Sequence, residues 1–66
     1  MAVSKIIELV GNSTVGWEDA ARFAVAAAAK SLHGITDVEV TSWTASVRDG
    51  DIVEYRAAVK IAFVVD

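Results

Sequence analysis

The segment "IVEYRAAVKIAFVV", residues 52–65, carries the clearest period in this 66-residue chain. Polar and small side chains, among them Glu54, Arg56 and Lys60, occupy every second position. Successive side chains of a strand point to opposite faces, so this period predicts a long strand with one buried face. The expected buried face carries Val53, Tyr55, Ala57, Val59, Ile61, Phe63 and Val65.

A hairpin is predicted just before this strand. The letters "RDGD", residues 48–51, contain an Asp-Gly pair, which is a strong signal for a tight two-residue turn between strands. The preceding segment "TDVEVTSWTASV", residues 36–47, again changes character every second residue, its valines alternating with Asp37 and Glu39. The two segments are therefore expected to pair as antiparallel strands.

A helix is predicted over "WEDAARFAVAAAAKSLHG", residues 17–34. Alanine, the best helix former, dominates this segment. Two acidic residues occupy its first turn and Lys30 and His33 its last, which complements the helix dipole, and Gly34 suits a left-handed cap. The residues that share one helical face, flanked by Val25 and Leu32, are Trp17, Ala20, Ala21, Ala24, Ala28 and Ser31.

The start of the chain completes the predicted order. "AVSKIIELVG", residues 2–11, is rich in β-branched residues and predicts a strand, and "GNSTVG", residues 11–16, predicts a turn into the helix. The fold class is therefore α+β in the order β-α-β-β. We expect one domain, residues 1–66, with a three-stranded antiparallel sheet and one helix packed on one face.

The composition predicts association. A chain of 66 residues buries only about 60% of the surface that its unfolded form exposes, so its own core is marginal. It contains no cysteine for disulfides, and 55% of its residues are hydrophobic. The simplest way to bury this apolar surplus is contact with further copies of the same chain, so a homo-oligomer is expected.

Charge and hydropathy exclude several classes of function. The net charge of −3 without basic clusters argues against binding to nucleic acid or to anionic membranes. The most apolar run, residues 23–29, is far shorter than the roughly 20 residues that span a bilayer. The first residues do not follow the pattern of a signal peptide, so a cytoplasmic location is expected.

The sequence offers no catalytic signature. "VGNSTVG", residues 10–16, lacks the spacing of a phosphate-binding loop, and no nucleophile is paired with a base, so no enzyme is expected. A single histidine and no cysteine exclude a His- or Cys-based metal site within one chain. Asp49 and Asp51 are interpreted as turn residues.

One group of residues remains as a candidate site. In a regular strand Asp37, Glu39, Thr41 and Trp43 share one side, and Arg56 lies near it across the hairpin. An aromatic plane, a guanidinium group and short hydroxyls can form a wall for a flat polar ligand. The alternative is that Trp43 packs against a neighbouring subunit and Arg56 pairs with an acid.

Three motifs indicate a family. They are "KIIELVGNS" (residues 5–13), "GWEDAA" (16–21) and "EYRAAVKIAFVVD" (54–66). With them the whole chain resembles the dodecins. The resemblance implies a hollow homododecamer with helices outside and sheet faces inside, which stores a small ligand, by default a flavin such as riboflavin or FMN.

The resemblance also implies which positions hold the flavin. In flavin-binding dodecins a Trp early in the second strand stacks on the isoalloxazine and a Gln in the third strand bonds its polar edge. Here these positions are Asp37 and Arg56, and Trp43 lies six residues further on. The candidate cofactor-binding residues are therefore Asp37, Trp43 and Arg56. Arg56 is predicted to pair with Asp37 or Glu39, from its own or an adjacent subunit.

A second interpretation needs no flavin. Symmetry axes of an oligomer can bring together several copies of Asp37 and Glu39, which would suit a divalent cation. The alternative function is thus a cation-associated or purely structural dodecamer.

Overall fold

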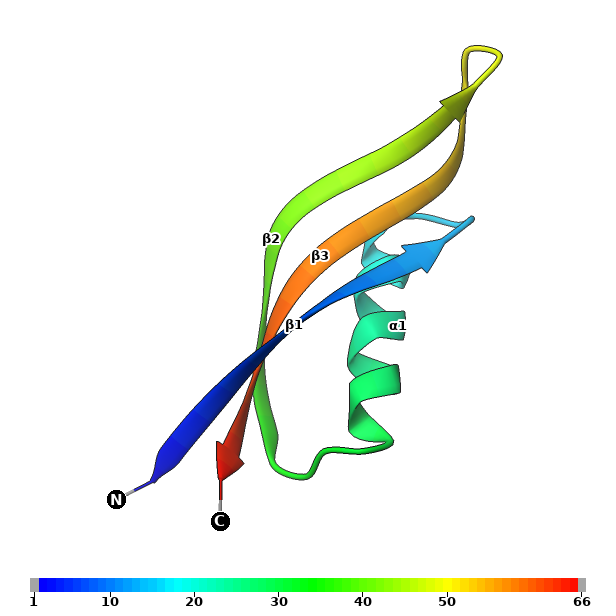
Figure 1. Cartoon of the computed structure of the whole chain (residues 1–66). Helices are drawn as coiled ribbons and strands as arrows, with labels where there is room; N and C mark the ends of the chain where they lie inside the picture. The colour runs from blue at the N-terminus through cyan, green and yellow to red at the C-terminus, as the bar shows by residue number, and fades with distance from the viewer. Residues whose placement is uncertain (1, 66) are drawn as a thin grey trace.

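The computed structural model describes residues 2–65 and confirms the predicted fold class. Strand β3 lies in the centre of a three-stranded antiparallel sheet, with β1 on one side and β2 on the other (Figure 1). The elements are β1 (Val3–Ser13), α1 (Trp17–Ala29), β2 (Ile35–Arg48) and β3 (Asp51–Val65).

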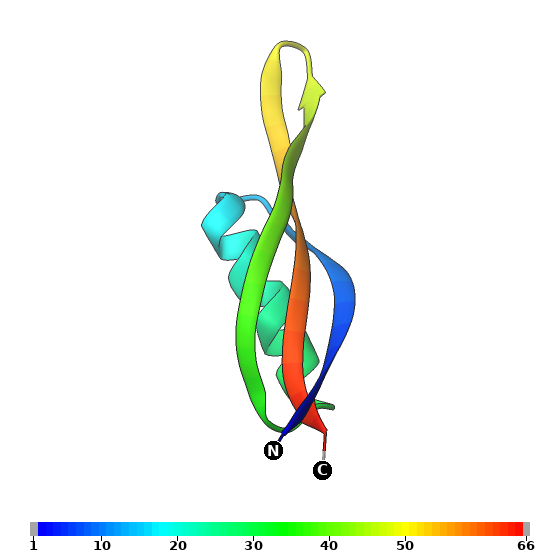
Figure 2. The same cartoon turned by 90° about the vertical axis from the view of Figure 1, so that its left-hand side faces the viewer.

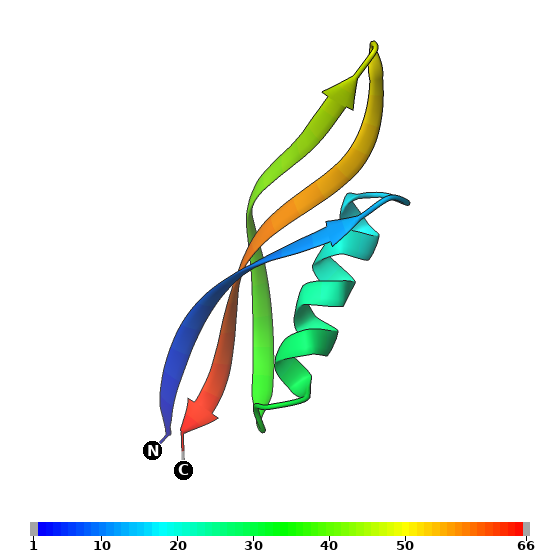
Figure 3. The same ribbon diagram turned by 45° about the vertical axis from the view of Figure 1, so that its right-hand side comes forward.

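The helix covers one face of the twisted sheet and leaves the other face bare (Figures 2 and 3). It lies over β1 and β3, with few contacts to β2. The buried core comes from the middle of the predicted faces of α1 and β3, whereas Val53 and Val65 at the ends of the predicted β3 face are exposed and Ser31 lies beyond the helix. The members of the core are Ala20, Ala24, Ala28, Ala57, Val59 and Ile61.

Strand β1 continues two residues beyond the predicted end, to Ser13. The prediction that a turn begins at Gly11 was wrong. Gly11 lies within the strand opposite Ala57, and a Cβ atom there would overlap the carbonyl oxygen of Ala20. This glycine is therefore needed for the close approach of β1 to α1.

The helix ends at Ala29, earlier than predicted. Lys30 is its cap, so the expected basic residues of the last turn, including His33, lie outside the helix. Just beyond the helix, the N–H of Leu32 still donates to the Ala28 carbonyl at 2.9 Å, and the Leu32 side chain packs against the core. Gly34 has the predicted positive φ of 73°, but it leads into β2, and its carbonyl accepts the N–H of Val64.

The predicted hairpin turn is confirmed. Asp49 and Gly50 have φ angles of 51° and 81°, the left-handed pair that suits a two-residue turn with the twist of the sheet. Arg48 and Asp51 are the last paired residues of the hairpin. Its tip projects well beyond the N-terminal end of α1 (Figure 1).

A bulge at Thr41 changes the faces of β2. Val40 pairs with Val59 and Ser42 with Ala58, so Thr41 has no residue opposite it. Its hydroxyl donates to the Ala58 carbonyl at 3.1 Å. The extra residue shifts the alternation by one position, so the expectation that Trp43 shares a side with Asp37 and Glu39 is wrong.

Candidate ligand-binding face

We call the side of the sheet away from α1 the open face. Residues paired directly across strands share a face, so the register with β3 assigns the paired positions. The open face carries Ser4, Ile6, Glu8, Val10 and Asn12 on β1, Asp37, Glu39, Ser42, Thr44 and Ser46 on β2, and Glu54, Arg56, Ala58, Lys60, Ala62 and Val64 on β3.

All five aromatic side chains lie away from the open face. Two are in the helix, and the other three belong to β2 and β3 positions that face it. They are Trp17, Phe23, Trp43, Tyr55 and Phe63. The open face of one chain therefore offers polar, charged and aliphatic groups, but no ring on which a planar ligand can stack.

Arg56 makes two side-chain hydrogen bonds on the open face. It lies between Asn12 of β1 and Thr44 of β2, and its Nη1 donates to the Ser46 hydroxyl at 2.6 Å and to Glu54 Oε1 at 3.2 Å. Its side chain is 31% exposed and that of Glu54 is 40% exposed. The guanidinium group is thus held in place while part of it remains open to a ligand.

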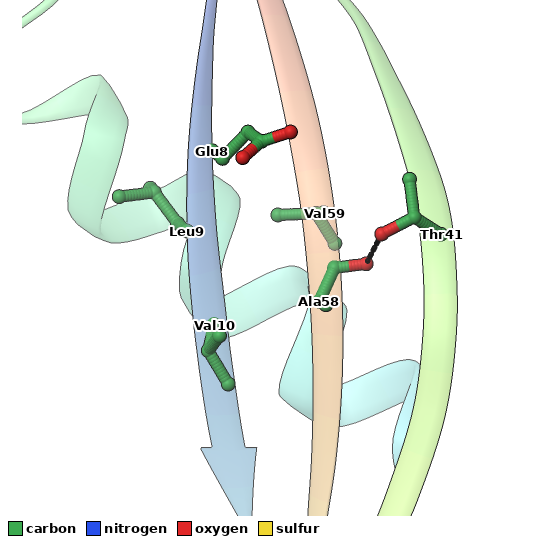
Figure 4. A pocket seen from close by; sticks show the side chains of 6 residues that line it. All are labelled: Glu8, Leu9, Val10, Thr41, Ala58 and Val59. Atoms are coloured by element: carbon green, nitrogen blue, oxygen red, sulfur yellow. Dashed lines mark hydrogen bonds between the residues drawn. The ribbon is translucent and has the colours of Figure 1, made fainter.

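A hollow of about 240 Å³ lies on the open face around Ala58, two residues from Arg56 along β3. Ala58 forms its floor because the small side chain leaves space between Val10 on one side and Thr41 on the other (Figure 4). Glu8 lies at its far end, where its carboxylate is 3.8 Å from the ammonium group of Lys60. Arg56 and Lys60 flank Ala58 on β3, each with an acidic neighbour, but neither of them lines the hollow.

The structure separates the three predicted site residues. Asp37 and Arg56 are both on the open face, but Asp37 pairs with Ala62, six residues from Arg56 on β3, which is roughly 20 Å. Within the chain Arg56 pairs with Glu54, so the prediction of Asp37 or Glu39 as its intrachain partner was wrong. Pairing with an adjacent subunit stays a prediction.

Trp43 belongs to an aromatic cluster on the helix side. Its ring lies 6.5 Å from that of Trp17, edge to face, and the ring of Tyr55 lies 4.8 Å from that of Trp17. The Trp17 indole N–H donates to the Thr44 carbonyl at 2.7 Å. Trp43 is still 54% exposed, so this cluster has room for contact with another molecule.

Sequence reasoning missed the role of Ser46. The alternation of Ser42, Thr44 and Ser46 was a usable signal, because it places three hydroxyl residues on one side of β2. The bulge at Thr41 and the pairing with Arg56 were needed to show that this side is the open face.

Residues 2–65 contain neither a candidate metal cluster nor a membrane-spanning helix. No group of three His, Asp or Glu side chains in this part of the chain is close enough to hold a metal ion. None of its helices is long and apolar enough to cross a membrane.

Comparisons with known proteins agree with this architecture. The sequence model of the family described as Dodecin matches residues 3–66. Among solved structures, the tt0972 protein of Thermus thermophilus is 30% identical, with a TM-score of 0.95 over 100% of this chain and 97% of that one. The dodecin of Streptomyces coelicolor is 28% identical, with a TM-score of 0.94 over 98% of this chain and 93% of that one. No curated protein sequence matches the chain significantly.

Proposed function

Since the chain belongs to the dodecin family, we propose that it assembles into a closed homododecamer and stores a small polar ligand without catalysing a reaction. The ligand binds on the open face, which the helix leaves uncovered. The family membership supports the assembly, and the geometry around Arg56 supports the binding site.

The observation that supports this binding site most directly is the position of Arg56. Ser46 and Glu54 fix its guanidinium on the open face, on the side of Arg56 away from Ala58, and part of the side chain remains exposed. A guanidinium group offers paired donors in one plane, which suits the oxygens of a phosphate, a carboxylate or neighbouring carbonyls. The ligand is therefore expected to present such a polar edge.

A flavin held by stacking does not fit this face. The position at which flavin-binding relatives carry an aromatic ring is Asp37, whose carboxylate accepts the Thr36 hydroxyl at 3.0 Å. No aromatic side chain lies on the open face of the chain. Free riboflavin is expected to bind weakly, and an FMN phosphate would have to depend on Arg56 instead of a stacking ring.

A second candidate is an assembly without an organic ligand. The pairing of Arg56 with Glu54 favours it, because an arginine whose charge is already balanced attracts an anion less strongly. In that case the open face would serve only as the inner wall of the shell, with Asp37 and Glu39 available to cations where copies meet.

The test is purification of the protein from its native host, followed by an absorbance spectrum and mass spectrometry of released small molecules. The wild type is compared with Arg56→Gln, and with Lys60→Gln as a control that removes the other positive charge of the open face. We expect a molecule that is retained by the wild type and the control and lost from Arg56→Gln. Retention by all three variants would contradict the role of Arg56, and no bound molecule in any of them would favour the second candidate.

A further inference from the structure

The guanidinium group of Arg56 is bound on one side only. Both of its side-chain hydrogen bonds within residues 2–65 use Nη1, which donates to the Ser46 hydroxyl at 2.6 Å and to Glu54 Oε1 at 3.2 Å. The side chain is 31% exposed. Its Nη2 and Nε atoms, which lie in the same plane, therefore remain as donors for the oxygen atoms of a ligand.

The charge of this guanidinium is balanced by Glu54, and the other groups around it are uncharged. Asn12 of β1 and Thr44 of β2 lie directly opposite Arg56, and both are exposed. Residues paired in this way have Cβ atoms about 4.5–5.5 Å apart, so both side chains are within reach of a ligand at Arg56. The ligand therefore meets one guanidinium, its carboxylate partner and neutral polar groups.

No second positive charge strengthens this site within the chain. The other cation among the paired positions of the open face is Lys60, four residues from Arg56 along β3, which is roughly 13 Å. Its ammonium group has its own acidic partner, Glu8, at 3.8 Å. Arg56 is thus a single cation whose charge is already matched.

The open face as a whole carries more acids than bases. Its paired positions hold four carboxylates against two cations, a difference of −2. The acids are Glu8, Asp37, Glu39 and Glu54, and the bases are Arg56 and Lys60. A surface with this balance repels anions, and every copy of the chain repeats it.

We propose that Glu54 makes the Arg56 site selective for ligands that are uncharged at the edge they present, and that it excludes phosphate and carboxylate groups. The Glu54 carboxylate repels the oxygens of a second anion beside the guanidinium, whereas a carbonyl or hydroxyl oxygen accepts the same hydrogen bonds without this repulsion. The inference rests on the proposed binding at Arg56 and narrows the class of ligand.

Binding of inorganic phosphate alone tests the exclusion. Phosphate is titrated into the assembled protein in a phosphate-free buffer, and its Kd is obtained from the broadening of the phosphorus NMR line. Glu54→Gln removes the charge, and Glu54→Asp keeps it. The control Glu39→Gln removes one acid from the same face at a position opposite Lys60 instead of Arg56. Light scattering verifies that all variants have the mass of the wild type.

Glu54→Gln is expected to lower the Kd for phosphate on the order of tenfold, because one negative charge a few ångströms from the anion is removed. Glu54→Asp and Glu39→Gln should stay near the wild type. Adding Arg56→Gln to Glu54→Gln should abolish the gain, since the gain depends on the guanidinium. Glu54→Thr, which introduces a residue that favours strands, is the second neutral variant if Glu54→Gln disturbs the assembly.

Three results would overturn the inference. These are an unchanged Kd in both neutral variants of Glu54, an equal gain in Glu39→Gln, and phosphate binding by the wild type that is as tight as in Glu54→Gln. A phosphorylated or carboxylated molecule that is released from the wild type and lost from Arg56→Gln would overturn it as well. Retention of the natural ligand by Arg56→Gln would instead refute the proposed binding site, and the phosphate titrations do not depend on that ligand, so the two failures are distinguishable.

Discussion

A single residue, Thr41, determines which chemistry each face of the sheet presents. Without the bulge, the alternation of β2 would place Trp43 beside Asp37 and Glu39 on the open face. With it, the indole lies on the helix side against Trp17, and Ser42, Thr44 and Ser46 lie beside Arg56 and Ala58. On the open face, the inserted residue therefore replaces an aromatic side chain with hydroxyl groups.

Asp37→Trp is expected to increase riboflavin affinity by restoring a ring on the open face. Stacking of a planar base on an aromatic side chain contributes about 1–3 kcal/mol, or roughly ten- to a hundredfold in Kd. The measurement is quenching of riboflavin fluorescence on titration with protein. Trp43→Phe is the control and should leave the affinity unchanged, because its ring lies on the other face. Equally tight binding by the wild type and Asp37→Trp would show that another surface stacks the flavin.

At the scale of elements, the distance between helix and sheet is set by small residues on both sides. Ala20, Ala24 and Ala28 line the buried face of α1, and Gly11 faces them from β1. Side chains this small bury little area each, but they allow the backbones to approach closely and pack densely. The stability of α1 depends on this packing against the sheet, because the helix has no side-chain cap at Gly16 and no basic residue in its last turn.

Gly11→Ala is expected to destabilise the fold, because the added methyl group overlaps the Ala20 carbonyl oxygen and the helix has to move. Overpacking of this kind costs about 1–3 kcal/mol. Gly16→Ala is the matched control, since a Cβ there has no atom within 4 Å and its φ of 173° suits any residue. Urea unfolding at one fixed protein concentration measures both, and equal midpoints would contradict the prediction.

Trp17→Phe is expected to loosen the attachment of the helix N-terminus to β2. The substitution keeps a ring against Tyr55 but removes the indole N–H that donates to the Thr44 carbonyl. A hydrogen bond of this kind contributes about 0.5–1.5 kcal/mol net. Hydrogen exchange of the α1 amides should become faster, and it should change less in Trp43→Phe, where the ring contact is largely kept. The same exchange rates in both variants would refute this role of the indole.

At the scale of the whole molecule, the chain is long and thin, and it leaves much apolar surface exposed. Trp43, Phe23 and Val47 are all exposed, although 55% of the residues are hydrophobic, and six side chains form the buried core of the described residues 2–65. A monomer of this shape has little internal burial to offset its conformational entropy. Folding and association are therefore expected to be coupled.

We expect light scattering to give a mass of about twelve times the 7.0 kDa of one chain, and no folded monomer at micromolar concentration. The apparent stability should rise with protein concentration, because only the assembled state buries the exposed apolar side chains. A midpoint of unfolding that does not depend on concentration, together with a monomer mass, would contradict both the assembly and the coupling.

The sequence by itself determined the four elements, their order and the buried faces of α1 and β3. These features follow from local rules: the 3.6- and two-residue periods, alanine propensity, and the Asp-Gly turn, each of which acts among neighbours in the chain. For the same reason the resemblance to the dodecins was visible in short motifs, and Asp37 and Arg56 could be placed on one face.

Only the tertiary structure decided what depends on contacts between distant segments. The role of Gly11 depends on Ala20, and the bulge at Thr41 becomes visible only in the register with β3. Arg56 has Glu54 and Ser46 as its partners because the strand pairing places them within reach. Periodicity cannot reveal one inserted residue in a strand, since the side chains on both sides of the insertion still alternate, while the face to which they point is fixed by the neighbouring strand.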